Sequence, residues 1–432
     1  MFHDVLADQN PHWVEKLDDC GIRRSHLDKL IEYLELPQVV AVTGVRRCGK
    51  SMLLKQAMHH LITNQKIAVE NILFLNLEQP FLLKFSDDVQ NLELIFQEYL
   101  TLKNPQGKIY VLLDEMQFFK DWPVFIKANY ENKQVKFIIT GSNSKLLSSD
   151  MVTMLSGRAI ALELYPLSLQ EIVNGKNIKS DSKSAIVSSR NEIKHCLLRS
   201  LEQGCFPEIL SISKQSLYYD VLNSYVKTIL LQDIAPRLNI RKPKQLEELF
   251  IYLASNIGSI ASYNTLSKQF SLSDKSVKEY IQAFEDAYLI FELNKFSFSS
   301  KPHNKTLKKI YAIDTGVANA CGFRFSSNNG KLLENMIFID CKSRGLDIFY
   351  YKTKQDFEID FIIKEHNNIA PIQVAYSIND QKTFDREVRA LQAAMDELNI
   401  DAGYLITMDP ILDFELQDPR IISIQAYEWL LR

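Results

Sequence analysis

The sequence predicts a multidomain α/β protein whose first part is a parallel sheet. A β-branched run at residues 39–43 is followed by a glycine-containing loop at 44–51 and by helix formers at 52–58. Further apolar runs recur at residues 72–77, 109–113 and 136–140. Short apolar runs that alternate with helical segments are typical of parallel strands joined by helices.

Length and composition bound the class of protein. The chain has 432 residues, which suggests about three domains at ~150 residues each. Its hydrophobic fraction of 46% and charged fraction of 24% are ordinary for a folded protein. The net charge of -3 gives no global sign of nucleic-acid or anionic-membrane binding. No apolar run approaches the ~18 residues of a membrane span, so we expect no membrane partner.

The N-terminal residues and the cysteines both indicate a cytoplasmic protein. A secretory signal begins with basic residues followed by an apolar run. The N-terminus instead carries Asp4 and Asp8, so it does not have the pattern of such a signal. The six cysteines are scattered and form no C-x-x-C pair: Cys20, Cys48, Cys196, Cys205, Cys321 and Cys341. We therefore expect reduced thiols in a cytoplasmic protein.

Residues 44–51 read GVRRCGKS and match the phosphate-binding loop G-x-x-x-x-G-K-[S/T]. Glycines let the backbone wrap so that its N–H groups point at phosphates, and the following helix N-terminus favours an anion. Lys50 is expected to reach the β- and γ-phosphates of ATP, and the Ser51 hydroxyl to bind Mg²⁺. The predicted nucleotide-binding residues are Gly44, Val45, Arg46, Arg47, Cys48, Gly49, Lys50, Ser51 and Met52. An ordinary glycine turn is the alternative, which the flanking strand and helix disfavour.

A second motif ends the apolar run at 109–113. Asp114 and Glu115 follow it directly, as in a Walker B motif. We expect Asp114 to hold Mg²⁺, through water, and Glu115 to orient and deprotonate the attacking water. A solvated turn is the alternative. The extra strand between the two motifs indicates the P-loop class that carries a catalytic glutamate.

Two further candidates follow the run at 136–140. Ser142 or Asn143 is expected to contact the γ-phosphate or the lytic water, unless they only cap a helix. Arg158 precedes a fifth predicted strand at 159–164 and is a candidate finger on a neighbouring subunit's ATP, which implies a homo-oligomer. A structural salt bridge is the alternative for Arg158.

The segments at residues 42–56, 110–117, 138–147 and 156–172 resemble the prokaryotic AAA-like ATPases that carry a C-terminal domain of unknown function. The resemblance covers nearly the whole chain. It implies four parts in order: a P-loop ATPase core at 1–166, a helical lid at 167–240, a winged helix at 241–310, and a restriction-endonuclease-like α+β domain at 311–432.

Between these parts, residues from about 174 to 191 lack an apolar period and are expected to form a flexible connection. In the predicted winged helix, Ser273 is the expected N-cap of the second helix. The following hairpin contains five lysines and no acid within 293–313: Lys295, Lys301, Lys305, Lys308 and Lys309. These lysines suggest contact with the phosphates of DNA, whereas the acids on the second helix favour protein packing instead.

In the last part, the resemblance places Glu334, Asp360 and Gln373 at metal-ligand positions of a nuclease fold. The nuclease motif's lysine is Ala375 here, and Lys352 or Lys354 is the candidate substitute. This departure favours a degenerate domain kept for binding or assembly with an unknown protein partner.

These features together predict an ATP-binding protein with slow, Mg²⁺-dependent hydrolysis that acts as a conformational switch. The alternatives are an ATP-regulated DNA-binding protein, an ATP-coupled nuclease, and a scaffold in which ATP is only structural.

Overall fold

The computed structural model describes residues 1–14, 20–131, 134–143, 157–240, 243–297, 307–322, 329–365 and 368–432. These residues form two compact units, Met1–Leu164 and Tyr165–Arg432. None of the helices in these ranges is both long and apolar enough to cross a membrane. All six cysteines are free thiols in this structure.

The first unit is built on a five-stranded sheet. Its strands are β1 (Val39–Thr43), β2 (Ile72–Asn76), β3 (Ile109–Asp114), β4 (Val135–Gly141) and β5 (Ala159–Glu163). Their order is β2-β3-β4-β1-β5, and every pair is parallel, which confirms the predicted parallel sheet. Because β4 lies between β1 and β3, residues after these three strands share one edge of the sheet.

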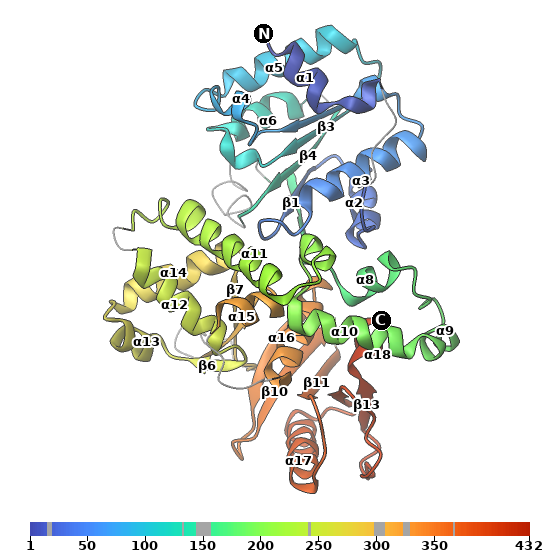
Figure 1. Cartoon of the computed structure of the whole chain (residues 1–432), viewed down its shortest axis with the longest axis vertical. Coiled ribbons are helices and arrows are strands. Elements are labelled where there is room, and N and C mark those ends of the chain that lie inside the picture. Colours follow the sequence, from blue (N-terminus) through green and yellow to red (C-terminus); the bar gives the residue numbers. More distant parts are fainter. Residues whose placement is uncertain are drawn as a thin grey trace. The chain divides into compact units, whose positions relative to one another are not determined.

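Helices cover both faces of this sheet (Figure 1). They are α1 (His3–Gln9), α2 (His26–Leu34), α3 (Lys50–Thr63), α4 (Pro80–Leu83), α5 (Gln90–Lys103) and α6 (Trp122–Tyr130), with short 3₁₀ helices at Pro11–Trp13, Val69–Asn71 and Met116–Phe118. α2 and α3 pack on one face, whereas α1, α5 and α6 lie on the other. Burial on both faces explains why the strands read as continuous apolar runs.

The second unit begins with helices α8 (Leu169–Gly175), α9 (Lys183–Ser188), α10 (Arg190–Gln203) and α11 (Gln215–Thr228), a 3₁₀ helix at Pro207–Ser211 and a π-helix at Ile229–Ile234. The expected flexible connection at 174–191 is therefore wrong in its second half. There the Ser182 side chain accepts a hydrogen bond from the backbone N–H of Ala185 at 3.2 Å and caps α9. No residue of α9 is buried, so the helix shows no apolar period in the sequence.

A helical segment with a small sheet follows. It contains α12 (Pro243–Ser255), β6 (Ser259–Ala261), α13 (Tyr263–Phe270), α14 (Asp274–Asp286), β7 (Ile290–Leu293) and β8 (Lys308–Ala312). The strands form an antiparallel sheet in the order β6-β8-β7. Ser273 caps α14 as predicted, since its hydroxyl accepts from the backbone N–H of Ser276 at 3.0 Å.

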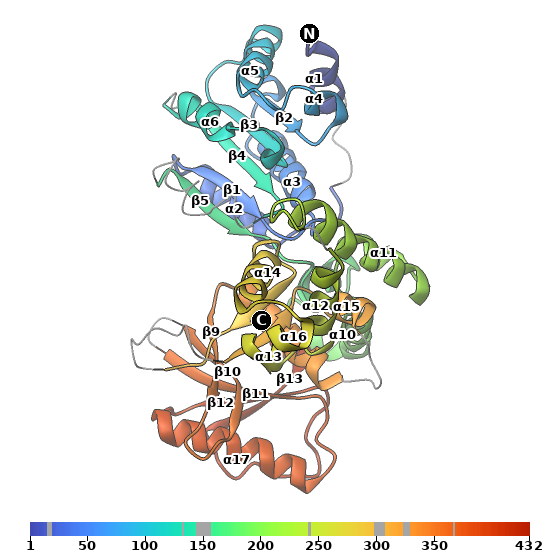
Figure 2. The ribbon, with the colours of Figure 1, turned by 90° about the vertical axis from the view of Figure 1, so that its left-hand side faces the viewer.

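The last segment forms a second five-stranded sheet with α15 (Thr315–Cys321), α16 (Asn329–Ser343), α17 (Gln381–Leu398) and α18 (Ala426–Leu430). Its strands are β9 (Asp347–Lys352), β10 (Glu358–Glu365), β11 (Asn368–Ala375), β12 (Gly403–Thr407) and β13 (Ile421–Gln425), in the order β13-β12-β11-β10-β9. α16 and α17 lie on opposite faces of this sheet (Figure 2).

Candidate functional site

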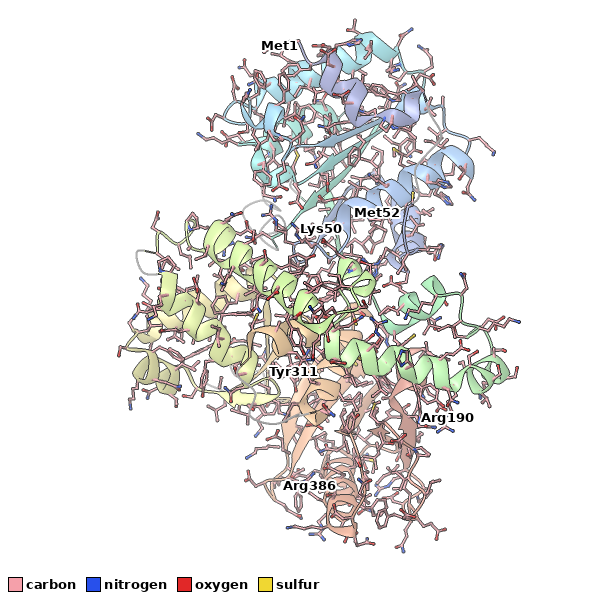
Figure 3. The ribbon with its side chains drawn as sticks, viewed as in Figure 1. Met1, Lys50, Met52, Arg190, Tyr311 and Arg386 are labelled. Carbon is pink, nitrogen blue, oxygen red and sulfur yellow. The ribbon has the colours of Figure 1, made fainter. Side chains whose placement is uncertain are left out.

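The phosphate loop joins β1 to α3, and two of its glycines are required by the backbone. Gly49 has a φ of +102° where α3 begins, in the left-handed region that side chains disfavour. At Gly44, an added Cβ would lie 2.1 Å from the carbonyl oxygen of Leu164. The loop therefore holds its shape only with glycine at these two positions. Figure 3 shows Lys50 and Met52 at the start of α3.

The Lys50 side chain lies inside this loop and is only 3% exposed. Its Nζ donates to the carbonyl oxygens of Gly44 at 3.1 Å and Val45 at 3.2 Å. It also lies 3.6 Å from Oε1 of Glu115, so the loop's cation and the Walker B glutamate form an ion pair. The two motifs, more than 60 residues apart in the sequence, therefore meet as predicted.

Asp114 ends β3 at the same edge and is 1% exposed. Burial raises the pKa of its carboxyl group, and hydrogen bonds with the Ser51 and Thr140 side chains counteract that rise. The Thr140 hydroxyl donates to Oδ1 of Asp114 at 2.6 Å. A carboxylate beside a serine hydroxyl is an all-oxygen donor set, which suits Mg²⁺. Ser51 and Asp114 therefore fit the predicted metal site.

Glu115 is held in an unusual backbone conformation, with φ at +57°. Its backbone N–H donates to Oγ1 of Thr140 at 2.9 Å. Its side-chain Oε2 accepts from Nε2 of Gln117 at 2.5 Å, and the same nitrogen lies 3.3 Å from Oγ of Ser142. The left-handed backbone and these bonds turn the carboxylate toward Lys50, so the site fixes the orientation of Glu115.

Thr140 and Gln117 are functional candidates that the sequence motifs did not indicate. Thr140 is fully buried at the end of β4 and bonds to both acids of the Walker B motif. The sequence does contain one indication: Thr140 is a polar residue at the end of an apolar strand, at the sheet edge where the phosphate loop lies. Ser142 joins the network through Gln117. Asn143 follows it in the chain, and its contact with phosphate or water stays a prediction.

The remaining loop residues have structural partners. The Arg46 guanidinium forms an ion pair with Glu78, which lies beyond the end of β2. The Arg46 side chain is therefore directed toward the protein rather than fully into solvent. The buried Cys48 carbonyl accepts from the Arg24 guanidinium at 2.6 Å, and burial raises the pKa of the Cys48 thiol. Arg47 adopts a φ of +68° at the turn of the loop.

Arg158 lies at the other edge of the sheet. It precedes β5, and its carbonyl accepts from the backbone N–H of Val39, the first residue of β1. Its guanidinium lies 5.1 Å from the Tyr130 ring centroid. Since β1 and β5 are parallel, the phosphate loop and Arg158 are at opposite ends of their strands. Arg158 therefore cannot serve the site of its own chain, and its role on a neighbouring subunit stays a prediction.

A second group of charged residues lies in the second unit. Nζ of Lys309, on β8, lies 3.1 Å from Oε1 of Glu334, 2.7 Å from Oε1 of Glu358 and 3.2 Å from Oδ1 of Asp360. Burial works to lower the pKa of Lys309, but the three carboxylates outweigh it and raise the pKa, so the group is an ammonium at neutral pH. Glu334 and Asp360 thus meet as the resemblance implied.

The expected role of the lysine-rich hairpin in DNA contact is wrong for Lys309, which is fully buried. Its neighbour Lys308 pairs with Glu292 at 3.2 Å, because adjacent residues of a strand point to opposite faces. Lys301 and Lys305 lie outside the described residues, and the Lys295 backbone bridges to Tyr350. Lys308 and Lys309 therefore give no support to DNA binding.

Lys352 and Lys354, the two expected substitutes for the nuclease lysine, have partners outside the acidic cluster. Lys352 pairs with Asp356 at 2.8 Å, and the backbone N–H of Lys354 donates to Glu397 at 2.9 Å. The lysine that enters the acidic cluster is instead Lys309, from another strand, a residue that the motif comparison missed.

Comparisons with known proteins agree with the nucleotide site. Residues 36–173 match a family model described as an AAA domain. Residues 194–328 and 329–427 match two domains of unknown function, DUF8612 and DUF4143. An uncharacterized protein of Haemophilus influenzae is 32% identical over 82% of this chain and 87% of its own. One from Methanocaldococcus jannaschii is 32% identical over 87% of this chain and 83% of its own.

A solved structure of C. elegans PCH-2 matches with a TM-score of 0.30 and 16% identity, over 48% of this chain and 64% of that one, a likeness too weak to support an argument. The assignment depends instead on the domain models, the close relatives and the site geometry. The chain belongs to the family of these bacterial and archaeal relatives, and it is an AAA-domain protein of ATPase type with C-terminal domains of unknown function.

Proposed function

We propose that this protein binds ATP, hydrolyses it with Mg²⁺, and uses the cycle as a conformational switch. The observation that carries the proposal is the convergence of Lys50, Ser51, Asp114 and Glu115 at one edge of the β1–β4–β3 sheet. These residues supply a phosphate-binding cation, two metal ligands and a base.

Each residue has a distinct task in this reaction. The loop N–H groups and Lys50 bind the β- and γ-phosphates, where the ammonium stabilises charge that develops on the phosphate oxygens. Ser51 and Asp114 would hold Mg²⁺, which neutralises phosphate charge when it is bound. Glu115 accepts a proton from the attacking water. Thr140 positions the Asp114 carboxylate and the Glu115 backbone through its two hydrogen bonds.

The ion pair between Lys50 and Glu115 supports the switch. Phosphate oxygens compete with the Glu115 carboxylate for the Lys50 ammonium, because both are anionic acceptors of hydrogen bonds from the same donor. When nucleotide binds, Lys50 turns to the phosphates and Glu115 is released toward the water. Nucleotide binding and assembly of the catalytic base are thereby coupled, and Gln117 retains the carboxylate near its position.

The test measures phosphate release from Mg²⁺-ATP by the full chain and by Glu115→Gln. Glutamine keeps the shape of the side chain but cannot accept the proton, so we expect ATP binding to persist and turnover to stop. Limited proteolysis of the Glu115→Gln variant, without nucleotide and with ATP or ADP, reports the switch. Equal turnover in both proteins would overturn the catalytic assignment. Identical proteolysis patterns in all three states would overturn the switch.

A further inference from the structure

The acidic cluster of the second unit does not fit a divalent metal. The resemblance to a nuclease fold predicted ligands from Glu334, Asp360 and Gln373. The position between the carboxylates is taken by the Lys309 ammonium, at 2.7 to 3.2 Å from one oxygen of each carboxylate. Mg²⁺ needs oxygens at about 2.0–2.1 Å and mostly keeps several waters, whereas these distances are those of N–H···O bonds.

The other oxygens of Glu334 and Asp360 also accept hydrogen bonds. Oε2 of Glu334 accepts from Nζ of Lys331 at 2.7 Å, and its Oε1 accepts from the Tyr311 hydroxyl at 2.7 Å. Oδ2 of Asp360 accepts from the backbone N–H of Val374 at 3.0 Å. Each oxygen of Glu334 and Asp360 therefore already accepts at least one hydrogen bond within the protein. Figure 3 labels Tyr311, which lies on β8 with Lys309 two residues before it.

Gln373, the third predicted ligand, is turned to other partners. Its amide nitrogen donates to Oε2 of Glu387 at 2.6 Å, and its carbonyl oxygen accepts from the backbone N–H of Asp360 at 3.3 Å. A carboxylate accepts hydrogen bonds and does not donate them, so Glu387 fixes the amide with its nitrogen toward the carboxylate. The neutral oxygen of Gln373 is thus used to hold the adjacent strands together.

The backbone is shaped around the same contacts. Gly258 has a φ of +66°, and a Cβ there would lie 3.1 Å from both carboxylate oxygens of Glu334 and 2.8 Å from Cδ of Lys331. The Gly258 carbonyl oxygen also accepts from Nζ of Lys331 at 2.9 Å. A side chain at this position would push Glu334 away from Lys309. The cluster is therefore closed by backbone as well as by side chains.

We propose that the Lys309 ammonium is a built-in cation that takes the place of a divalent metal, and that it joins β8 to α16 and β10 as a metal-independent, non-catalytic junction. Lys309 belongs to the β6-β8-β7 sheet, while its partners belong to α16 and to the other sheet of this unit. With the ammonium in place, the cluster cannot hold a metal for phosphodiester chemistry. Without it, the three carboxylates would lose the cation that they share, with only Glu334 still paired to Lys331, and would form a cation site.

The experiment uses the full chain without nucleotide. The chain carries Asp114→Asn, which removes a predicted metal ligand of the nucleotide site. Thermal unfolding is measured in chelator and in 1 mM Mn²⁺. We expect the same melting temperature for this protein in both solutions. Adding Lys309→Ala should lower the melting temperature in chelator by on the order of 10 °C. Mn²⁺ should restore at least half of that loss, because the ion replaces the missing positive charge.

Two variants make the result specific. Lys308→Ala, on the adjacent residue of β8 but facing Glu292, should gain no response to Mn²⁺. Asp360→Asn added to Lys309→Ala should abolish the Mn²⁺ response, because it removes a carboxylate of the cage. A Lys309→Ala protein that folds and melts at the same temperature with and without Mn²⁺ would overturn the proposal.

The unmutated cluster provides a second test that does not depend on Lys309→Ala folding. Electron paramagnetic resonance counts the Mn²⁺ ions bound to the Asp114→Asn protein, and we expect none at 0.1 mM. A bound ion that Asp360→Asn removes would show that the cluster takes a metal despite Lys309. The triple variant Lys309→Met, Glu334→Gln, Asp360→Asn should fold and give no response to Mn²⁺, since it removes the ammonium together with two of its three carboxylates and leaves only Glu358.

Discussion

The Thr140 hydroxyl, at the end of β4, donates a 2.6 Å hydrogen bond to Oδ1 of Asp114, at the end of the neighbouring strand β3. Oγ1 of Thr140 also accepts a hydrogen bond from the backbone N–H of Glu115. A single hydroxyl therefore connects the predicted metal ligand to the predicted base. Since Thr140 is fully buried, no solvent replaces it if it is removed.

Thr140→Val should lower turnover with little effect on ATP binding. Valine keeps the shape but leaves Oδ1 of Asp114 without its donor and frees the Glu115 backbone, which misplaces both groups. We expect kcat to fall roughly 10- to 100-fold, because small misplacements of catalytic groups cost about this much. Steady-state phosphate release measures it, and Thr140→Ser is the control that should retain activity. An unchanged kcat in the valine variant would show that the hydroxyl has no role in positioning.

Lys50→Ala should strongly weaken nucleotide binding. The variant loses the charge-assisted bonds from the ammonium to the phosphates, which we expect to weaken affinity by roughly 100-fold. Titration with a fluorescent ATP analogue measures the change. Lys55→Ala, farther along the same helix α3, is the matched control and should bind normally. If Lys50→Ala binds as tightly as the native chain, the phosphate-loop assignment is wrong.

Arg158→Ala tests the trans-acting finger. Because Arg158 lies at the sheet edge away from its own phosphate loop, it can act only on another subunit. A finger of this kind contributes about 10³- to 10⁵-fold to turnover. We expect a specific ATPase rate that rises with protein concentration and a loss of that rise in Arg158→Ala. A rate per molecule that is independent of concentration in both proteins would leave Arg158 as a structural residue that packs on Tyr130.

DNA cleavage should be absent. The ammonium of Lys309 fills the acidic cluster, and Ala375 supplies no charge where a nuclease would have lysine. Plasmid and linear DNA incubated with Mg²⁺ or Mn²⁺, with or without ATP, should stay intact on a gel. Cleavage that disappears in Asp360→Ala would make an ATP-coupled nuclease the better interpretation, whereas cleavage that persists in that variant would indicate contamination.

Asp314 gives the second unit a pH-dependent stability. Burial raises the pKa of its carboxyl group from 3.8 to about 6, although the N–H groups of Cys205, Val317 and Gly316 counteract the rise. The folded state therefore binds this proton more tightly than the unfolded state. The stabilisation from this group is present below about pH 4 and is lost as the pH rises to about 6, by roughly 2–3 kcal/mol.

Urea unfolding of the native chain and Asp314→Asn at pH 4, 5, 6 and 7 measures this effect. Asparagine does not titrate, so the free-energy difference between the two proteins should shift against the native chain between pH 4 and pH 6 and stay constant above. Asparagine cannot provide both acceptor oxygens, so a constant offset is expected as well. A difference that does not vary with pH would show that Asp314 titrates normally.

The sequence by itself determined the nucleotide site, because that site is built from short motifs. The phosphate loop is continuous from Gly44 to Ser51, and its glycines and lysine act through local backbone geometry. Asp114 and Glu115 are recognisable since they end an apolar strand. Strand direction then brings both motifs to one edge, because all five strands are parallel. The Ser273 cap is equally local and was also predicted.

Only the tertiary structure decided the positions and partners of Thr140, Arg158 and Lys309. Thr140 matters because β4 lies beside β3, a pairing that the order of residues does not state. Arg158 is at the far edge because β5 runs parallel to β1. Lys308 and Lys309 look alike in the sequence, but adjacent strand residues face opposite sides, and only packing against α16 and β10 buries the second one. A buried charge is tolerated where distant residues neutralise it, and those partners are assembled only by folding.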